Sequence, residues 1–177
     1  MWQFCRTVFT KALGLEEKDG MITFQKSIFV NRPVEEIFHY ATDNNFFDRW
    51  MPGLVFSKIS SDAITLNMGA TLLQRIQFAT IAEDIMGRVV TFEPERRWAY
   101  TGLGETFCFR RMWSFERLSK GTKIHFYEEL SSRKPLPIYF NFMLRYKLSK
   151  VNTKSLEALK RDLESKGTFL PSLASSR

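Results

Sequence analysis

The sequence predicts an α+β fold in which an antiparallel sheet of about seven strands is covered on one face by a long C-terminal helix. Three observations support this prediction. One strand pattern precedes two short helical patterns, about six strand-like runs then follow without a helix between them, and a long helical pattern comes last. Strands that follow one another without crossover helices pair antiparallel, and a sheet with one apolar face needs a cover. The last helix is the segment long enough to provide it.

Residues 21–30 alternate between apolar and polar side chains, which is the pattern of a half-buried strand. Pro33 and the two acidic residues close behind it suit the first turn of a helix. Proline fixes the backbone angle that this turn needs, and the carboxylates interact favourably with the helix dipole. A short helix is therefore expected from Pro33 to about residue 41, and a second one at about 43–50.

The rest of the chain contains six further strand-like runs and one long helical pattern. Leu144, Leu148 and Leu156 recur at a spacing that places them on one face of this helix, so that face is expected to cover the sheet. The expected strands lie at about residues 54–60, 69–78, 81–92, 97–103, 106–117 and 122–131, and the helix at about 137–165.

Composition limits the classes of protein to which the chain can belong. Hydrophobic residues make up 44% of the 177 residues and charged residues 25%, which are globular proportions and exclude a disordered chain. No apolar run has the length of a membrane-spanning helix. Cys5, Cys108 and two histidines provide neither a disulfide framework nor a finger-type zinc set. We expect one domain in a reducing, cytoplasmic location, without a structural metal and without an obligatory cofactor.

The charge is concentrated toward the C-terminal end. Residues 133–177 hold ten Lys or Arg and three Asp or Glu, which accounts for the whole formal net charge of +7. A solvated helix face explains such a cluster, and so does attraction to an anionic membrane surface. Because its first fifteen residues are amphipathic and free of acid, the segment 1–20 is interpreted as a leader, either interfacial or organelle-targeting, or else docked or frayed. Residues 21–165 form the domain, and residues 166–177 a tail.

One hairpin has a register that the sequence predicts. Ser119 and Lys120 form its turn, so Leu118 should face Gly121 and the numbers of facing residues should sum to 239. This register gives one face of opposite charges and one face of apolar side chains, whereas a slip by one residue would set aromatic rows against charged ones. The facing pairs are Glu116 with Lys123, Arg110 with Glu129, Phe115 with Ile124, Trp113 with Phe126, and Phe109 with Leu130.

Two charged residues interrupt the apolar face of this hairpin. Arg111 and Glu128 lie on it directly opposite each other, and burying either one alone would be costly. Together they form either a structural ion pair or the polar anchor of a ligand whose body is held by the aromatic residues. Gln74 lies on a similar apolar row of another strand and is a candidate for a third polar contact. The candidate wall residues are Phe109, Trp113, Phe115, Ile124, Phe126 and Leu148.

The opposite face of the hairpin carries His125, Tyr127 and Glu129. We expect this face to be exposed to solvent rather than catalytic. Cys108 lies on the same outer row as Arg110, without a His or Asp partner that the sequence identifies. The chain has no nucleophile elbow, Walker loop, dinucleotide fingerprint or H-E-x-x-H motif, so no catalytic residue is assigned.

Several segments in a fixed order carry a family resemblance. They are SIFVNRPVEEIFHYATD, DRWMPG, MGATLLQRI, GRVVTFEPERRWAY, the hairpin MWSFERLSKGTKIHF and SLEALKRDLE. Over about residues 21–165 the chain resembles the START-like, or SRPBCC, superfamily of polyketide cyclase/dehydrase-like proteins. The resemblance implies a helix-grip fold, in which a seven-stranded antiparallel sheet wraps around a long C-terminal helix and two short helices follow the first strand. It is specific for fold rather than for activity.

The resemblance also implies a cavity between the sheet and the C-terminal helix. Binding or carriage of a lipid, sterol, quinone or polyketide-like molecule there is the first hypothesis. The second is a cyclase or dehydratase acting in the same cavity, with Glu128 as acid or base and Arg111 polarising a carbonyl, although an adjacent arginine lowers the pKa of a carboxyl group. The third is a peripheral membrane or protein-interaction module that uses the basic C-terminal surface. A nucleic-acid partner is not expected, because no binding motif is present.

Overall fold

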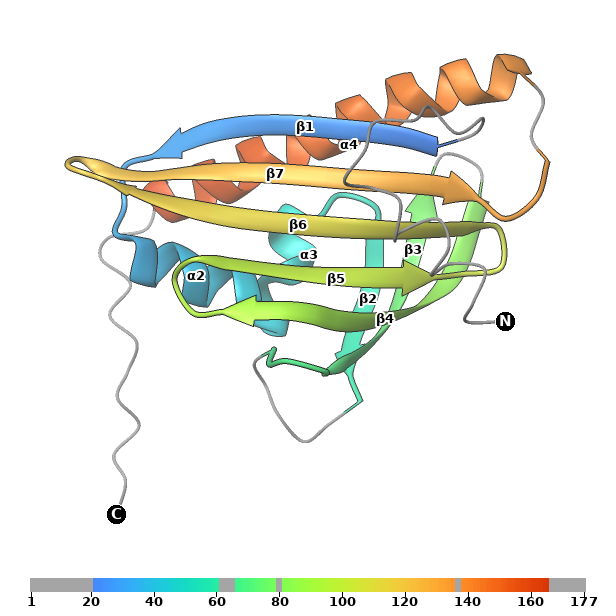
Figure 1. Ribbon diagram of the computed structural model, residues 1–177. Helices are drawn as coiled ribbons and strands as arrows, with labels where there is room; N and C mark the ends of the chain where they lie inside the picture. Colours follow the sequence, from blue (N-terminus) through green and yellow to red (C-terminus); the bar gives the residue numbers. More distant parts are fainter. Residues whose placement is uncertain (1–20, 61–65, 79–80, 136–137, 166–177) are drawn as a thin grey trace.

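The computed structural model describes residues 21–60, 66–78, 81–135 and 138–165, and this part of the chain confirms the predicted fold class. It forms one antiparallel sheet of seven strands in the order β1-β7-β6-β5-β4-β3-β2 (Figure 1). The strands are β1 (Met21–Val30), β2 (Leu54–Ile59), β3 (Thr71–Phe78), β4 (Ile81–Glu93), β5 (Arg97–Leu103), β6 (Phe107–Leu118) and β7 (Gly121–Ser132). The predicted leader and tail lie outside the described residues.

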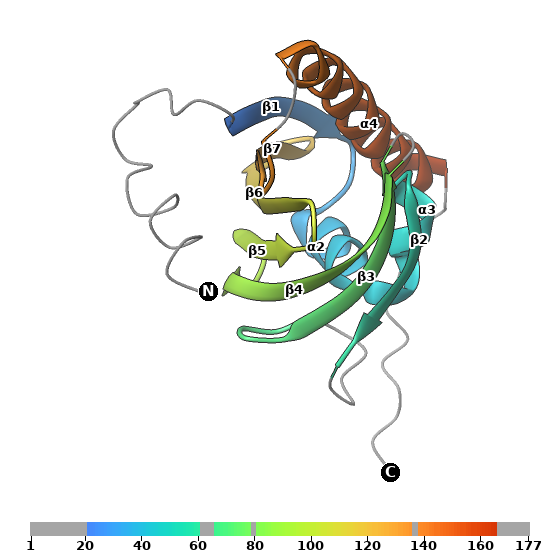
Figure 2. The ribbon, with the colours of Figure 1, turned by 90° about the vertical axis from the view of Figure 1, so that its right-hand side faces the viewer.

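Four helical segments accompany the sheet in the described residues. α2 (Val34–Thr42), the 3-10 turn η1 (Asn44–Phe46) and α3 (Phe47–Trp50) follow β1, and α4 (Ile138–Ser165) follows β7. Figure 2 shows that the sheet curls into a trough, with α2 inside it and α4 across its opening beside β1. None of these helices is both long and apolar enough to cross a membrane.

The element boundaries agree with the predicted ones to within a few residues. The second short helix divides into the 3-10 turn η1 and the single α-helical turn of α3. Asp43 stabilises the beginning of η1, because its carboxylate accepts a hydrogen bond from the backbone N–H of Asn45 at 2.9 Å. Pro33 precedes α2 as its N-cap residue rather than standing in its first turn.

The predicted register of the β6–β7 hairpin is confirmed. Leu118 faces Gly121, and the pairing then continues in step along both strands, so the five predicted pairs all stand opposite each other. The carboxylate of Glu116 turns toward His125, whose Nε2 lies 3.2 Å from its Oε2. The turn and the alternation of apolar and charged residues therefore agree on one pairing.

Aromatic side chains from neighbouring strands fill the middle of the trough. Trp98 of β5 and Trp113 of β6 face each other in register and stack with their ring centroids 4.2 Å apart. Tyr100 extends the stack, with its ring centroid 5.5 Å from that of Trp98. All three are buried, and such aromatic pairs contribute roughly 0.5–1.5 kcal/mol beyond the burial of their area. Open space in the trough therefore has to lie to one side of the stack.

The C-terminal end of α4 is held by the segment that joins β1 to α2. The hydroxyl of Tyr40 donates a hydrogen bond to Asp162 at 2.6 Å, and Nε of Arg32 donates to the carbonyl of Leu163 at 3.0 Å. Burial, reinforced by the hydrogen bond to Asp162, raises the pKa of Tyr40, so this hydroxyl keeps its proton. These contacts fix where α4 lies against the trough.

Gly121→Ala is expected to destabilise the protein by more than Gly69→Ala, because only the former also creates a clash. Both glycines have a positive φ, 150° and 83°, so an alanine costs about 1–2 kcal/mol of backbone strain at either site. A Cβ at Gly121 would also collide with the carbonyl oxygen of Val30, whereas one at Gly69 meets nothing within 4 Å. Urea unfolding measures both variants, and equal losses of stability would contradict the described turn.

Candidate functional site

A crevice opens beside the aromatic stack, between the loop after α3 and the inward face of α4. Its floor is formed by Arg111, Trp113 and Phe126 of β6 and β7. The space left empty by the atoms that line it is about 570 Å³, with the open mouth included. The volume that the centre of a water molecule can reach is only about 40 Å³. The site is therefore narrow and mostly apolar. Its other lining residues are Trp50, Met51, Pro52, Gly53, Leu54, Ile76, Gln77, Val151, Asn152, Ser155 and Leu156.

A buried polar network lies at the floor of this crevice. Nε of Arg111 donates a hydrogen bond to Oε1 of Glu128 at 2.6 Å, and its Nη1 donates to the hydroxyl oxygen of Tyr100 at 2.9 Å. Nδ2 of Asn152 donates to the other carboxylate oxygen of Glu128. The strand residues meet because Tyr100 faces Arg111, which in turn faces Glu128 on the next strand. The network thus joins β5, β6, β7 and α4.

The electrostatics of the network favour one fixed protonation state. Burial opposes the charge of Arg111, but the carboxylate of Glu128 and the hydroxyl of Tyr100 more than compensate, so the pKa of Arg111 is raised. Burial also raises the pKa of Tyr100, which Arg111 only partly counteracts, so this hydroxyl stays protonated. Arg111 and Glu128 form an ion pair, so the floor contains one positive and one negative charge and is neutral overall.

Arg111 is the charged member of the network that faces the crevice. Its side chain is 17% exposed, whereas that of Glu128 is fully buried. Its guanidinium carbon lies 4.3 Å from the ring centroid of Phe109, in a cation–π contact. A guanidinium carries five N–H donors, and two of them bind Glu128 and Tyr100. No described residue accepts from the others, so they are available to an oxygen atom of a bound molecule.

The structure divides the predicted site residues into two groups. Arg111, Trp113 and Phe126 line the crevice, and Glu128 lies directly behind Arg111. The other five are buried in the core and are not part of the described crevice lining. They are Gln74, Phe109, Phe115, Ile124 and Leu148. As contacts to a ligand, all nine residues remain predictions.

Gln74 lies beside Tyr100 of the floor network, whose pKa its side chain lowers, and it also begins a second polar chain. Its Nε2 donates to Oγ of Ser57 at 3.2 Å, and that hydroxyl donates to Oδ1 of Asn44 at 2.6 Å. Oε1 of Gln74 is buried and has no partner among the described residues. This chain connects η1 with β2 and β3, so it fixes the loop side of the trough.

Two members of the floor network were not predicted from the sequence. Asn152 lies between Leu148 and Leu156 on the inward face of α4. A polar residue on an otherwise apolar helix face was the pattern from which its role could have been predicted. Tyr100 lies two residues after Trp98, on the same face of β5, so in the sequence it has the pattern of an ordinary core aromatic residue. Its hydroxyl becomes part of the site only because β6 places Arg111 opposite it.

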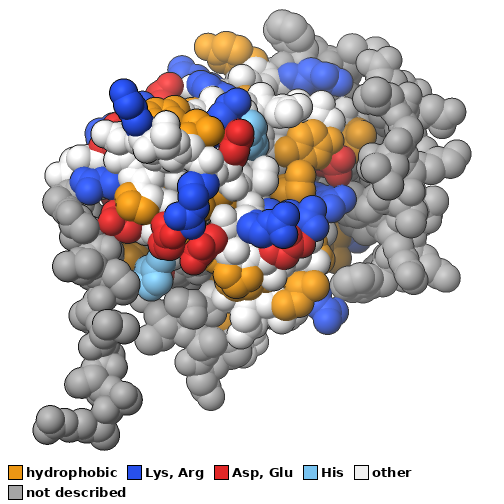
Figure 3. All heavy atoms as spheres, turned by 60° about the vertical axis from the view of Figure 1, so that its left-hand side comes forward, with side chains coloured by type: hydrophobic (Ala, Val, Ile, Leu, Met, Phe, Trp, Pro, Cys, Tyr) orange, Lys and Arg blue, Asp and Glu red, His pale blue; other side chains and the backbone are white. Residues whose placement is uncertain are grey.

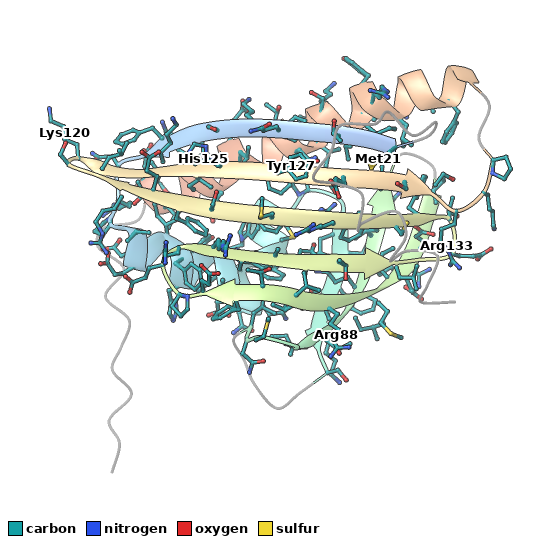
Figure 4. The ribbon with its side chains drawn as sticks, viewed as in Figure 1. Met21, Arg88, Lys120, His125, Tyr127 and Arg133 are labelled. Carbon is teal, nitrogen blue, oxygen red and sulfur yellow. The ribbon has the colours of Figure 1, made fainter. Side chains whose placement is uncertain are left out.

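The other titratable residues considered in the sequence analysis lie on the convex face of the sheet, which is the outside of the trough. Figure 4 shows His125 and Tyr127 on β7, and the alternation along the hairpin puts Cys108 on the same face, as predicted. The ring of His125 is bonded to Oγ of Ser27, 2.8 Å from its Nδ1, and to Glu116. On the side of the molecule that Figure 3 shows, acidic and basic side chains of the described residues are interspersed. The described residues contain no group of three or more His, Cys, Asp or Glu able to hold a metal ion.

The described residues thus form an α+β domain with a mostly apolar crevice and a neutral polar floor between the sheet and the C-terminal helix. Residues 21–164 match the model of the family described as polyketide cyclase / dehydrase and lipid transport, and the chain belongs to this family. The START-like resemblance stated from the sequence is thereby confirmed. No curated protein matches the sequence.

Solved structures share the fold at low sequence identity. The Zhui aromatase/cyclase from Streptomyces sp. R1128 is 14% identical, with 81% of this chain and 94% of that chain covered and a TM-score of 0.70. A START superfamily protein from Mycobacterium smegmatis is 15% identical, with 81% and 97% covered and a TM-score of 0.67. At these sequence identities the similarity shows the helix-grip fold and does not identify a ligand.

Arg111→Met is expected to lower the free energy of unfolding by about 3–5 kcal/mol, because Glu128 would keep a buried charge without its partner. Adding Glu128→Gln removes this charge while an amide oxygen still accepts from Asn152, so the double variant should recover most of the loss. Arg97→Met, at the exposed pair with Glu93, is the control and should change the free energy of unfolding far less. Urea unfolding compares them. A double variant no more stable than Arg111→Met would contradict this account.

Proposed function

We propose that the protein binds and carries an apolar small molecule in the crevice between the sheet and α4, with an oxygen atom of the ligand held by Arg111. One observation carries the proposal: a guanidinium fixed from behind by Glu128 and Tyr100 has unused N–H donors beside a space walled by aromatic rings. The family description, which includes lipid transport, supports it. Lipids, sterols, quinones and polyketides all combine an apolar body with a few oxygen atoms.

The charge balance of the floor narrows the class of ligand. Because Glu128 already neutralises Arg111, an anionic ligand group would bring an unbalanced charge into a buried site. A ketone, quinone carbonyl, ester or hydroxyl accepts the same hydrogen bonds without that cost. The proposed ligand therefore has a neutral oxygen acceptor rather than a free carboxylate.

Ligand entry requires the crevice to widen. Pockets for small molecules usually enclose about 300–1,000 Å³. The volume of this crevice that the centre of a water molecule can reach is far smaller, about 40 Å³. The loop side is tied to β3, because the backbone N–H of Gln77 donates to the carbonyl of Gly53 at 2.7 Å. The opposite wall, α4, is anchored by side-chain contacts at its C-terminal end and by the hydrogen bond from Asn152 to Glu128. We propose that α4 moves to admit the ligand.

The geometry favours binding over acid–base catalysis. Cyclisation and dehydration need a group that exchanges protons near neutral pH. The described crevice lining contains no His, Asp or Glu, and His125 lies on the convex face. Both carboxylate oxygens of Glu128 are occupied, one by Arg111 and one by Asn152. Glu128 therefore holds the floor in place rather than being free to move a proton.

The basic C-terminal surface supports a separate prediction. Lys150, Lys154 and Arg161 of α4 are exposed, which leaves them available to an anionic membrane surface as well as to solvent. This contact, and the cytoplasmic location, remain predictions from the sequence.

Titration with cis-parinaric acid and with its methyl ester tests the proposed function. Energy transfer from Trp50 and Trp113, which line the crevice, reports binding of either polyene. The methyl ester is expected to bind at least about tenfold more tightly than the acid, because only the acid brings a charge into the site. The double variant Arg111→Met/Glu128→Gln should weaken binding of the ester about tenfold, as expected for loss of a hydrogen bond to a charged group.

A matched control makes the same two substitutions at an exposed ion pair. Arg97→Met/Glu93→Gln removes a pair outside the crevice and should bind the ester like the unaltered protein. The proposal fails if neither polyene binds saturably, or if the double variant at Arg111 and Glu128 binds the ester as tightly as the control does.

A further inference from the structure

An apolar row crosses the convex face of the sheet. Cys108 of β6 faces Leu103 of β5, which faces Met86 of β4. Met86 in turn faces Leu73 of β3, and we call these four residues the outer row. Leu73, Met86 and Leu103 are 43%, 64% and 37% exposed. The described helices pack on the concave side (Figure 2), so this contiguous apolar strip lies on the face that they leave uncovered.

Two polar groups on that same face are buried, one in the outer row and one beside it. Cys108 is 6% exposed, and Glu129, two positions from the residue that faces Cys108, is 4% exposed. One carboxylate oxygen of Glu129 accepts from the hydroxyl of Tyr127 at 2.8 Å, but the other is buried without a partner among the described residues. Burial, followed by this hydrogen bond, raises the pKa of Tyr127 to about 12. These observations indicate that a further segment shields this part of the sheet from water.

Residues 1–20 are the segment of the chain best placed to reach it. They lead directly into Met21, which faces Ser131, and Ser131 faces Cys108, so the segment joins the sheet at the end of the outer row. From β1 to β3 the row crosses five strand spacings, which is about 24 Å. Twenty residues span about 30 Å even as a helix, so the segment is long enough.

The composition of residues 1–20 complements the convex face. Trp2, Phe9 and Leu13 recur near helical spacing and provide an apolar side for the outer row. Arg6 and Lys11 are the only charged residues among the first fifteen, and either could donate to the unpaired oxygen of Glu129.

We propose that residues 1–20 pack across the outer row, where they bury the thiol of Cys108 and pair Arg6 or Lys11 with Glu129. The convex face then becomes an interior surface, separate from the ligand crevice on the other side of the sheet. The proposal is independent of the proposed function, because it uses none of the crevice residues.

A nitroxide attached to Cys5 in the full-length Cys108→Ser protein tests this docking. The methyl NMR signals of Leu73, Met86 and Leu103 should be broadened selectively. The signals of Leu118, at the hairpin turn, and of Leu148, in α4, should stay sharp. Absence of broadening, or broadening centred on α4, overturns the proposal. So does broadening that arises only between spin-labelled and isotope-labelled copies in a mixture, because that result assigns the surface to a second copy.

Thiol reactivity provides a second measurement on the full chain. In a Cys5→Ser background, Leu73→Glu places a charge in the outer row three strands away from Cys108 and should speed the reaction of Cys108 with Ellman's reagent at least tenfold. Leu118→Glu alters a leucine of similar exposure, 40%, outside the row and should leave the rate unchanged. Equal rates in the two variants would overturn the proposal.

Discussion

The buried ion pair of Arg111 and Glu128 is the constraint on which the rest of the structure depends. Either charge alone in an aromatic interior would be strongly unfavourable, so the two strands have to be in register when they are buried. The turn at Gly121 provides that register, and Tyr100 and Asn152 complete the hydrogen bonds of the pair. Because the bond from Asn152 comes from α4, satisfying one carboxylate also sets how the helix lies over the sheet.

The position of the crevice follows from packing around this pair. Trp98, Trp113 and Tyr100 fill the middle of the trough, which displaces open space to the side where α4 meets the loop after α3. There the edge of the stack and the guanidinium of Arg111 lie together. A family described by both cyclase chemistry and lipid transport is compatible with either use of such a space. In this chain the fully bonded carboxylate of Glu128 favours binding.

Local patterns were sufficient to predict the fold and part of the site. A two-residue turn and strict alternation predicted that Arg111 would face Glu128, since both signals act between neighbouring strands. Asn152 was not predicted, because its contact depends on the rotation of α4 against the sheet, which only tertiary packing determines. The extent of the crevice depends in the same way on side-chain volumes. The burial of Glu129 was missed because alternation assigns a face to solvent without regard to what else packs there.

Native mass spectrometry of the protein, purified from cells under non-denaturing conditions, tests the central claim most directly. The account predicts one apolar molecule with a neutral oxygen group bound per chain, retained by Arg97→Met/Glu93→Gln and lost from Arg111→Met/Glu128→Gln. A protein that shows only its own mass after incubation with a total lipid extract would contradict the claim. So would a ligand that both double variants retain equally.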